Sequence, residues 1–290
     1  MKKFKILIPV YNDWQSLSTL LNNIDNEIKN LDHEFSIIVI DDASTFHRHL
    51  NIKNLLNIKS IKILSMKENK GHARCIAAGL KYIFEKEEFD YVIPMDGDGE
   101  DRPEEIKEFV KSVENLPEQT VVGERVKRSE AFVFRFCYFF HKIITLVFTS
   151  HSIKYGNFTC LTKHTVEKLL NEKATWNSFS GSLTKVEKNK ISIPSIRGER
   201  YFGPSKMSFN NLLKHSLSII SVFRKTVLIR SALFIIVYIL IIKSNASIIT
   251  AIPLILLLIM IYSISSLALR ENMDEFDKSL SNINSIENIK

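Results

Sequence analysis

The chain has 290 residues, of which 45% are hydrophobic, and a formal net charge of +7 at pH 7. This length allows one large domain with a well-buried core and an appendage. The three cysteines are widely spaced and form no C-x-x-C pattern, which argues against a zinc site and a disulfide framework.

Apolar strands alternate with helical patterns through the N-terminal part. Strands are predicted at residues 5–10, 35–40, 61–64 and 91–95, and helices at 14–31, 71–84 and 103–113. Each strand is nearly continuously apolar, which is typical of a parallel sheet covered by helices on both faces. The predicted fold class is therefore α/β, with ligands expected at the carboxyl ends of the strands.

Two acidic residues end the second of these strands. Asp41 or Asp42 could accept hydrogen bonds from a base N–H or from ribose hydroxyls, and a helix cap or turn is the alternative. The sequence has no G-x-x-x-x-G-K-[ST] motif, and no G-x-G-x-x-G follows the first strand, which weakens kinase, ATPase and dehydrogenase interpretations. A nucleotide would then be held mainly by carboxylates and a metal.

The fourth strand runs directly into an acidic loop that contains glycines. Asp96, Asp98 and Glu100 can converge there on one hard cation, and such oxygen ligands suit Mg²⁺ or Mn²⁺ shared with substrate phosphates. An EF-hand does not fit, because Asp101 stands where its loop requires glycine and Lys107 where it requires a bidentate acid. The loop predicts an enzyme acting on a phosphorylated donor, with a solvated acidic turn as the alternative.

Two long apolar runs, 227–242 and 246–269, follow in the C-terminal part. The second is long enough to cross a bilayer and the first reaches that length if its ends lie in the interface, whereas the alternative is a buried hairpin of a soluble protein. Basic residues crowd the approach to the first run, so the positive charge favours a membrane over nucleic acid as partner. By the positive-inside rule the N-terminal part faces the cytoplasm and the connector 244–246 faces outward. Residues 271–290 are expected to form a polar cytoplasmic tail, poorly ordered beyond its first turn or two.

Segments 131–148 and 208–225 are amphipathic. They are either membrane-interface helices or surface helices packed on the domain. The expected organisation is an enzymatic domain over 1–225 that includes both segments, a two-helix transmembrane anchor over 226–270, and the tail. The expected location is the cell (inner) membrane, in a multi-pass arrangement.

The motifs together carry a family resemblance. In order and spacing, four of them resemble the family 2 glycosyltransferases of the GT-A fold: Ile8–Asp13, Val39–Ser44, Asn69–Gly71 with Ala77–Gly79, and Met95–Glu104. The two C-terminal apolar runs and the stretch Arg200–Met207 are similar to the polyprenyl-phosphate glycosyltransferases of the dolichol-phosphate mannose synthase type. The resemblance covers about residues 4–270.

The resemblance implies residue roles. It places these residues in the donor site: Pro9, Tyr11, Asp13, Asp41 or Asp42, Asp96, Arg200, Ser205 and Lys206. It implies that Asp96, Asp98 and Glu100 hold Mg²⁺ or Mn²⁺ on the donor diphosphate, where many relatives have Gln in place of Glu100.

Arg125 and Arg135 correspond to arginines that grip the acceptor phosphate in these relatives, so the resemblance places them with Asp98 among the catalytic residues. Each arginine could instead be a surface or snorkelling residue. The loop with Arg200, Ser205 and Lys206 would close over the donor phosphates, or touch anionic lipid, or both.

The acceptor is expected to be ionised already. Asn157 occupies a region where many relatives with hydroxyl acceptors carry an acid, and an amide cannot take a proton. The Q-x-x-R-W signature of processive synthases is absent. The predicted function is one transfer of sugar from a nucleotide diphosphate sugar to a polyprenyl phosphate. A monomer and a homo-oligomer are both open as the form of the enzyme. The alternatives are another lipid or lipid-linked acceptor, and a non-catalytic membrane-associated protein that binds metal.

Overall fold

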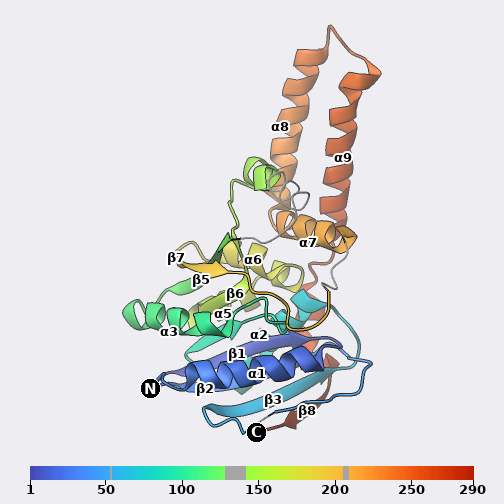
Figure 1. The fold of residues 1–290 in the computed structure, drawn as a ribbon. Coiled ribbons are helices and arrows are strands. Elements are labelled where there is room, and N and C mark those ends of the chain that lie inside the picture. The colour runs from blue at the N-terminus through green and yellow to red at the C-terminus, as the bar shows by residue number, and fades with distance from the viewer. Residues whose placement is uncertain (53, 128–141, 205–208) are drawn as a thin grey trace.

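A mixed sheet forms the centre of the globular part in a computed structural model that describes residues 1–52, 54–127, 142–204 and 209–290 (Figure 1). Across the sheet, the strands of this described part run in the order β7-β5-β6-β4-β1-β2-β3-β8. Their bounds are β1 Lys3–Val10, β2 Glu34–Asp41, β3 Ile58–Met66, β4 Tyr91–Pro94, β5 Thr120–Lys127, β6 Tyr155–Thr162, β7 Lys190–Ile196 and β8 Ile283–Asn288.

The four strands predicted from the sequence form the parallel centre of the sheet. β1 pairs with β2 on one side and with β4 on the other, and β2 pairs with β3, all in parallel. β6 and β8 run antiparallel to their neighbours β4 and β3. The α/β prediction with a mostly parallel sheet is confirmed.

Helices cover both faces of the sheet. α1 (Trp14–Ile28) and α3 (Ile106–Asn115) pack on one face, and α2 (His72–Lys86), α5 (Lys163–Leu170) and α6 (Phe179–Val186) on the other. Side chains alternate between the faces along a strand, so Ile6 and Ile8 of β1 join the core with α1, whereas Leu7 joins the core with α2. Both faces are buried, which explains why these strands are continuously apolar.

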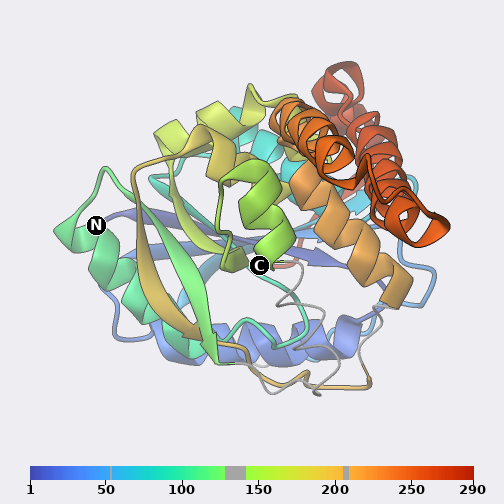
Figure 2. The ribbon, with the colours of Figure 1, turned by 90° about the horizontal axis from the view of Figure 1, so that it is seen from above.

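A helical hairpin projects from the globular part (Figures 1 and 2). It consists of α8 (Arg224–Ile242) and α9 (Ile248–Ala268), and both helices are long and apolar enough to cross a membrane. Most of their side chains lie outside any core, as Ile241 at 69% and Ile249 at 78% exposure illustrate. The alternative of a buried hairpin is therefore wrong for the described residues, because the rest of the described chain does not cover these helices.

The predicted amphipathic segments lie at the base of this hairpin. Within 131–148, residues 128–141 lie outside the described residues, and 142–149 are helical. The segment 208–225 contains α7 (Phe209–Ser221), which crosses the hairpin base (Figure 1). Ile220 of α7 is buried with Val227 of α8 and Ile264 of α9. α7 thus packs on the hairpin as well as on the domain.

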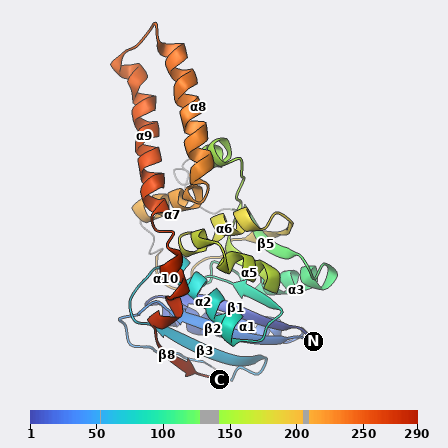
Figure 3. The same ribbon diagram turned by 180° about the vertical axis from the view of Figure 1, so that it is seen from behind.

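Residues 271–290 return to the globular part, contrary to the expectation of a poorly ordered tail (Figure 3). The segment contains α10 (Met273–Asp277), a short 3-10 turn (Ser279–Asn282) and β8, which pairs antiparallel with β3. Phe276 is 1% exposed and stacks on Trp176 with ring centroids 5.4 Å apart. A few well-spaced apolar residues suffice to dock this segment, but they are scattered among Asn, Ser and charged residues, a composition that by itself suggests disorder.

Candidate active site

The acidic loop lies where the sequence predicted, at the carboxyl end of β4. The backbone N–H of Asp96 donates to the Asp101 carboxylate at 2.9 Å, which fixes the start of the loop. The Asp96 side chain contacts His72 Nε2 at 2.9 Å and accepts a hydrogen bond from Asn157 Nδ2 at 3.3 Å. The loop therefore meets the start of α2 and the strand β6.

Two arginines from the loop after β7 lie on the carboxylates of this acidic loop. Arg200 forms ion pairs with Asp98 and with Asp13, the latter at 2.8 Å. Arg197 forms an ion pair with Glu100. Arg200 thereby bridges the ends of β1 and β4, and the cationic loop covers the acidic one.

The two loops are also in direct backbone contact. The N–H of Gly198 donates to the carbonyl of Glu100 at 2.8 Å, and the N–H of Tyr201 donates to the carbonyl of Asp98 at 2.9 Å. Gly99 has φ +93°, and a Cβ there would lie 2.7 Å from the Tyr201 ring. Glycine at 99 thus permits both the left-handed turn and the close approach.

The two carboxylates at the end of β2 make different contacts. Asp42 accepts the backbone N–H groups of Lys70 at 2.7 Å and Gly71 at 2.9 Å, so it holds the loop before α2. Asp41 accepts the N–H of Ser44 at 2.9 Å. Since both Asp42 oxygens are engaged by the loop, Asp41 is the better candidate of the two for donor binding.

The turns after β1 and β2 are locked together beside this acidic end. Asn12 has φ +52°, and its side-chain oxygen accepts the N–H groups of Thr45 and Phe46, each at 2.9 Å. Pro9 is buried in β1, and the Tyr11 ring is 43% exposed at its end. The predicted donor residues on β1 and β2 therefore share one edge of the sheet with the acidic loop.

Arg125, the first predicted acceptor residue, approaches the same edge from β5. A Cβ at Gly156 would lie 2.9 Å from Arg125 Nη2, so glycine there leaves room for the guanidinium. The Arg125 charge contributes to lowering the pKa of Asp96. The predicted Arg135, Ser205 and Lys206 lie outside the described residues.

Burial and the crowding of acids together shift the pKa values of the acidic loop. Burial, followed by the nearby Asp96 charge, raises the pKa of Asp98 to about 6 and that of Asp101 to about 8. Burial also opposes ionisation of Asp96, but His72, Arg125 and Asn157 together outweigh burial and hold the pKa of Asp96 below its usual range. Such clustered and partly buried acids favour a cationic ligand.

The carboxylate oxygens of the acidic loop suit Mg²⁺ or Mn²⁺, because these ions prefer oxygen ligands and can bind through one or two carboxylates plus substrate phosphates. Among the described residues, no three His, Cys, Asp or Glu side chains already converge as a metal site. Asp98 and Glu100 face Arg200 and Arg197 instead. The residues that would hold such a cation are Asp96 and Asp98, and Asp98 would then have to exchange its ion pair with Arg200.

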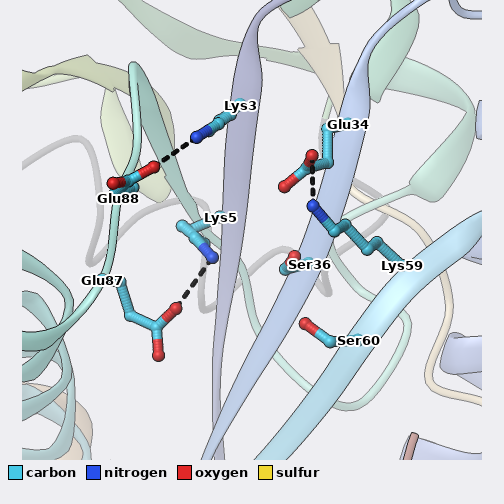
Figure 4. A pocket seen from close by; sticks show the side chains of 8 residues that line it. All are labelled: Lys3, Lys5, Glu34, Ser36, Lys59, Ser60, Glu87 and Glu88. Atoms are coloured by element: carbon cyan, nitrogen blue, oxygen red, sulfur yellow. Dashed lines mark hydrogen bonds and ion pairs between the residues drawn. The ribbon is translucent and has the colours of Figure 1, made fainter.

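A pocket at the opposite edge of the sheet is a poorer candidate (Figure 4). It lies near the amino ends of β1 and β2, and its charges pair with one another. Lys5 and Glu87 lie 2.9 Å apart, and Lys3 pairs with Glu88. Because these side chains neutralise one another, they leave little charge to bind a ligand. We therefore assign no ligand to this pocket.

Two residues of the site are not predicted by any sequence motif. His72 follows Gly71 at the start of α2, and Arg197 lies three positions before the predicted Arg200. Neither stands in a pattern that distinguishes it from a surface residue. The only available signal was the position of His72 directly after the Asn69–Gly71 motif.

A protein-family model described as "Glycosyl transferase family 2" matches residues 5–178. Curated relatives include two enzymes named undecaprenyl-phosphate 4-deoxy-4-formamido-L-arabinose transferase. The one from Proteus mirabilis (strain HI4320) is 28% identical and the one from Photorhabdus laumondii subsp. laumondii 29% identical, each over 227 residues that cover 73% of this chain. The chain spans 65% of the length of these relatives.

Solved structures agree with the fold. Glucosyl-3-phosphoglycerate synthase from Mycobacterium tuberculosis, in complex with Mn²⁺, uridine-diphosphate-glucose and phosphoglyceric acid, superposes with a TM-score of 0.56 at 12% identity. The match covers 78% of this chain and 80% of that one. The predicted GT-A fold is therefore confirmed.

Proposed function

Because the chain belongs to glycosyl transferase family 2, we propose that it transfers one sugar from a nucleotide diphosphate sugar to a polyprenyl phosphate at the membrane surface. The observation that carries the proposal is the joining of an acidic, arginine-covered site and an apolar hairpin in one chain. The undecaprenyl-phosphate transferases among the relatives support a lipid phosphate as acceptor.

The chain's own residues suit a reaction that needs no general base. In the proposed step, an ionised oxygen of the lipid phosphate forms a bond to the anomeric carbon. The bond from that carbon to the diphosphate oxygen breaks, and the nucleoside diphosphate leaves with the electron pair. Asn157, next to Asp96, cannot take a proton. An in-line attack of this kind inverts the configuration at the anomeric carbon.

In the proposed reaction, arginines bind the phosphates and aspartates bind the metal ion. Arg200 would exchange its contact with Asp98 for the donor phosphates, and Arg125 would meet the acceptor phosphate with its guanidinium fork. Asp96 and Asp98 would hold Mg²⁺ or Mn²⁺, which neutralises the leaving diphosphate when it is bound. Tyr11 and Asp41 would bind the nucleoside at the ends of β1 and β2.

The membrane hairpin explains how such an enzyme reaches its acceptor. A polyprenyl chain cannot leave the bilayer, so the site must work at its surface. α7 and the helix at 142–149 pack at the hairpin base, between the apolar projection and the sheet. The proposed location is the cell (inner) membrane, with the enzymatic domain in the cytoplasm.

The test uses the purified full chain with UDP-, GDP- and dTDP-sugars, labelled in the sugar, and undecaprenyl phosphate in detergent. Label is expected in the lipid phase with one class of donor, and only with Mg²⁺ or Mn²⁺ present. Label that appears only in hydroxyl-bearing acceptors would overturn the proposed acceptor. No transfer from any of a full panel of nucleotide sugars would overturn the activity.

A further inference from the structure

The loop after β7 is attached to the domain through a short run of residues. Just before this run, the N–H of Ile196 donates to the Glu105 carboxylate at 2.8 Å. The side chain of Arg197 then pairs with Glu100, and the N–H of Gly198 donates to the Glu100 carbonyl at 2.8 Å. Glu100 therefore binds the loop through both its side chain and its backbone.

The backbone at this attachment is so close to the acidic loop that position 198 has no space for a side chain. A Cβ at Gly198 would lie 2.6 Å from the Gly99 carbonyl and 3.1 Å from Arg102 Cγ. The Glu100 side chain is 15% exposed and that of Arg197 is 28% exposed, so the pair is largely shielded from water. Shielding from water strengthens the attraction between the two charges of an ion pair.

The carboxylates of the acidic loop therefore have different surroundings. Asp96 faces His72 and Asn157, and Asp98 shares the Arg200 guanidinium with Asp13. Glu100 faces the attachment point of the covering loop instead. A cation bound by Asp98 would displace Arg200, which lies three residues beyond Arg197, while the attachment through Arg197 would persist.

We infer that Glu100 anchors the Arg200-bearing loop through Arg197 and is not a ligand of the metal, an inference that rests on the proposed function. Glu100 is thus a positioning residue. It keeps Arg200 within reach of the donor phosphates when Arg200 releases Asp98. This assignment replaces the metal role that the family resemblance implied for Glu100.

Two measurements on the full chain in detergent test the inference without turnover, and the KM of each variant for the donor is a third. Mn²⁺ binding is followed by electron paramagnetic resonance with the metal alone. Hydrogen exchange reports on residues 197–204. The variants are Glu100→Gln, Arg197→Gln, the charge-swapped pair Glu100→Arg with Arg197→Glu, and Asp98→Asn. Glu104→Gln, on an exposed acid nearby, is the matched control.

Glu100→Gln is expected to change the Mn²⁺ dissociation constant by no more than about threefold, because the charge of Glu100 lies near Asp98 but is paired with Arg197. Asp98→Asn should weaken Mn²⁺ binding by at least roughly tenfold. Glu100→Gln and Arg197→Gln should each speed exchange in 197–204 and raise the KM for the donor, and the charge-swapped pair should restore protection. Glu104→Gln should do neither.

Equal loss of Mn²⁺ binding in Glu100→Gln and Asp98→Asn would overturn the inference. Unchanged hydrogen exchange in both Glu100→Gln and Arg197→Gln would also overturn it. This comparison does not depend on the charge-swapped pair, so it remains decisive if that pair does not fold. If the wild type transfers no sugar to undecaprenyl phosphate, the proposed function fails instead, and the binding and exchange comparison still stands.

Discussion

Asp98 is the residue on which the charges of the site converge. It is partly buried, lies near Asp96, and pairs with Arg200, which also holds Asp13. Replacing it by Ala removes one proposed metal ligand and one anchor of Arg200. The transition state would then lose stabilisation of the negative charge that develops on the leaving diphosphate.

Asp98→Ala is therefore expected to lower turnover by roughly 10²- to 10³-fold, the size typical of losing one electrostatic stabiliser. Lipid-phase product formed at saturating donor and metal measures the effect. Glu104→Gln should keep wild-type turnover, because its exposed carboxylate lies outside the proposed machinery. Near-normal turnover of Asp98→Ala would contradict the site assignment.

Asp25 shows how one residue holds a distant strand. It is 6% exposed on α1, and its carboxylate accepts the N–H groups of Leu56, Asn57 and Ile58 at the start of β3. Burial opposes ionisation of Asp25, but these donors outweigh burial and lower its pKa. The ionised form therefore stabilises the fold.

Asp25→Asn is expected to lower the free energy of unfolding by about 2 kcal/mol at pH 7, the worth of hydrogen bonds to a charged group. Because the folded pKa is the lower one, the contribution is complete above the unfolded pKa of about 4 and disappears as the pH falls through the folded value. Denaturation of variant and wild type at pH 7 and pH 3 should show the difference shrinking in acid. Asp32→Asn, on an exposed acid after α1, is the control, and an equal effect there would refute the assignment.

At the scale of elements, the C-terminal segment acts as a clamp on α2 and its preceding loop. Glu275 of α10 accepts Trp176 Nε1 at 2.9 Å and pairs with Lys70 at 3.3 Å and Arg74 at 3.4 Å. The Lys70 backbone is the one held by Asp42, and His72 on Asp96 comes two residues later. The clamp thus reaches the edge of the proposed site.

Phe276→Ala should destabilise the protein by about 3 to 5 kcal/mol, because it leaves a cavity beside Trp176. Thermal denaturation in detergent measures the loss, and hydrogen exchange of β8 should rise with it. Ile286→Ala, at a position of β8 that is 49% exposed, should change stability by less than about 1 kcal/mol. If both variants were equally mild, the segment would not be docked as described.

At the scale of the whole molecule, both ends of the apolar hairpin connect to the same sheet. The chain enters α8 from α7 and leaves α9 toward α10 and β8, which pairs with β3 (Figure 3). If the hairpin crosses a bilayer, the sheet requires that it cross an even number of times. This arrangement agrees with the positive-inside expectation of a cytoplasmic domain and C-terminus.

Cysteine labelling in intact cells tests this topology. In a chain without its natural cysteines, Ser244→Cys in the connector should react with a membrane-impermeant maleimide, and Lys278→Cys after α10 should react only after lysis. Both positions are exposed, so accessibility depends on the membrane and not on the fold. Reaction of Lys278→Cys in intact cells would refute the proposed orientation.

The sequence by itself determined the parallel strands, the acidic loop after β4 and the apolar hairpin, because each is encoded by neighbouring residues through periodicity, burial or run length. Only the tertiary structure decided what faces these carboxylates. Arg197 and Glu100 are 97 positions apart, and Arg200 and Asp98 are 102 apart. It also decided that residues 271–290 complete the sheet. Pairing over such separations depends on how the elements pack, and no local pattern records it.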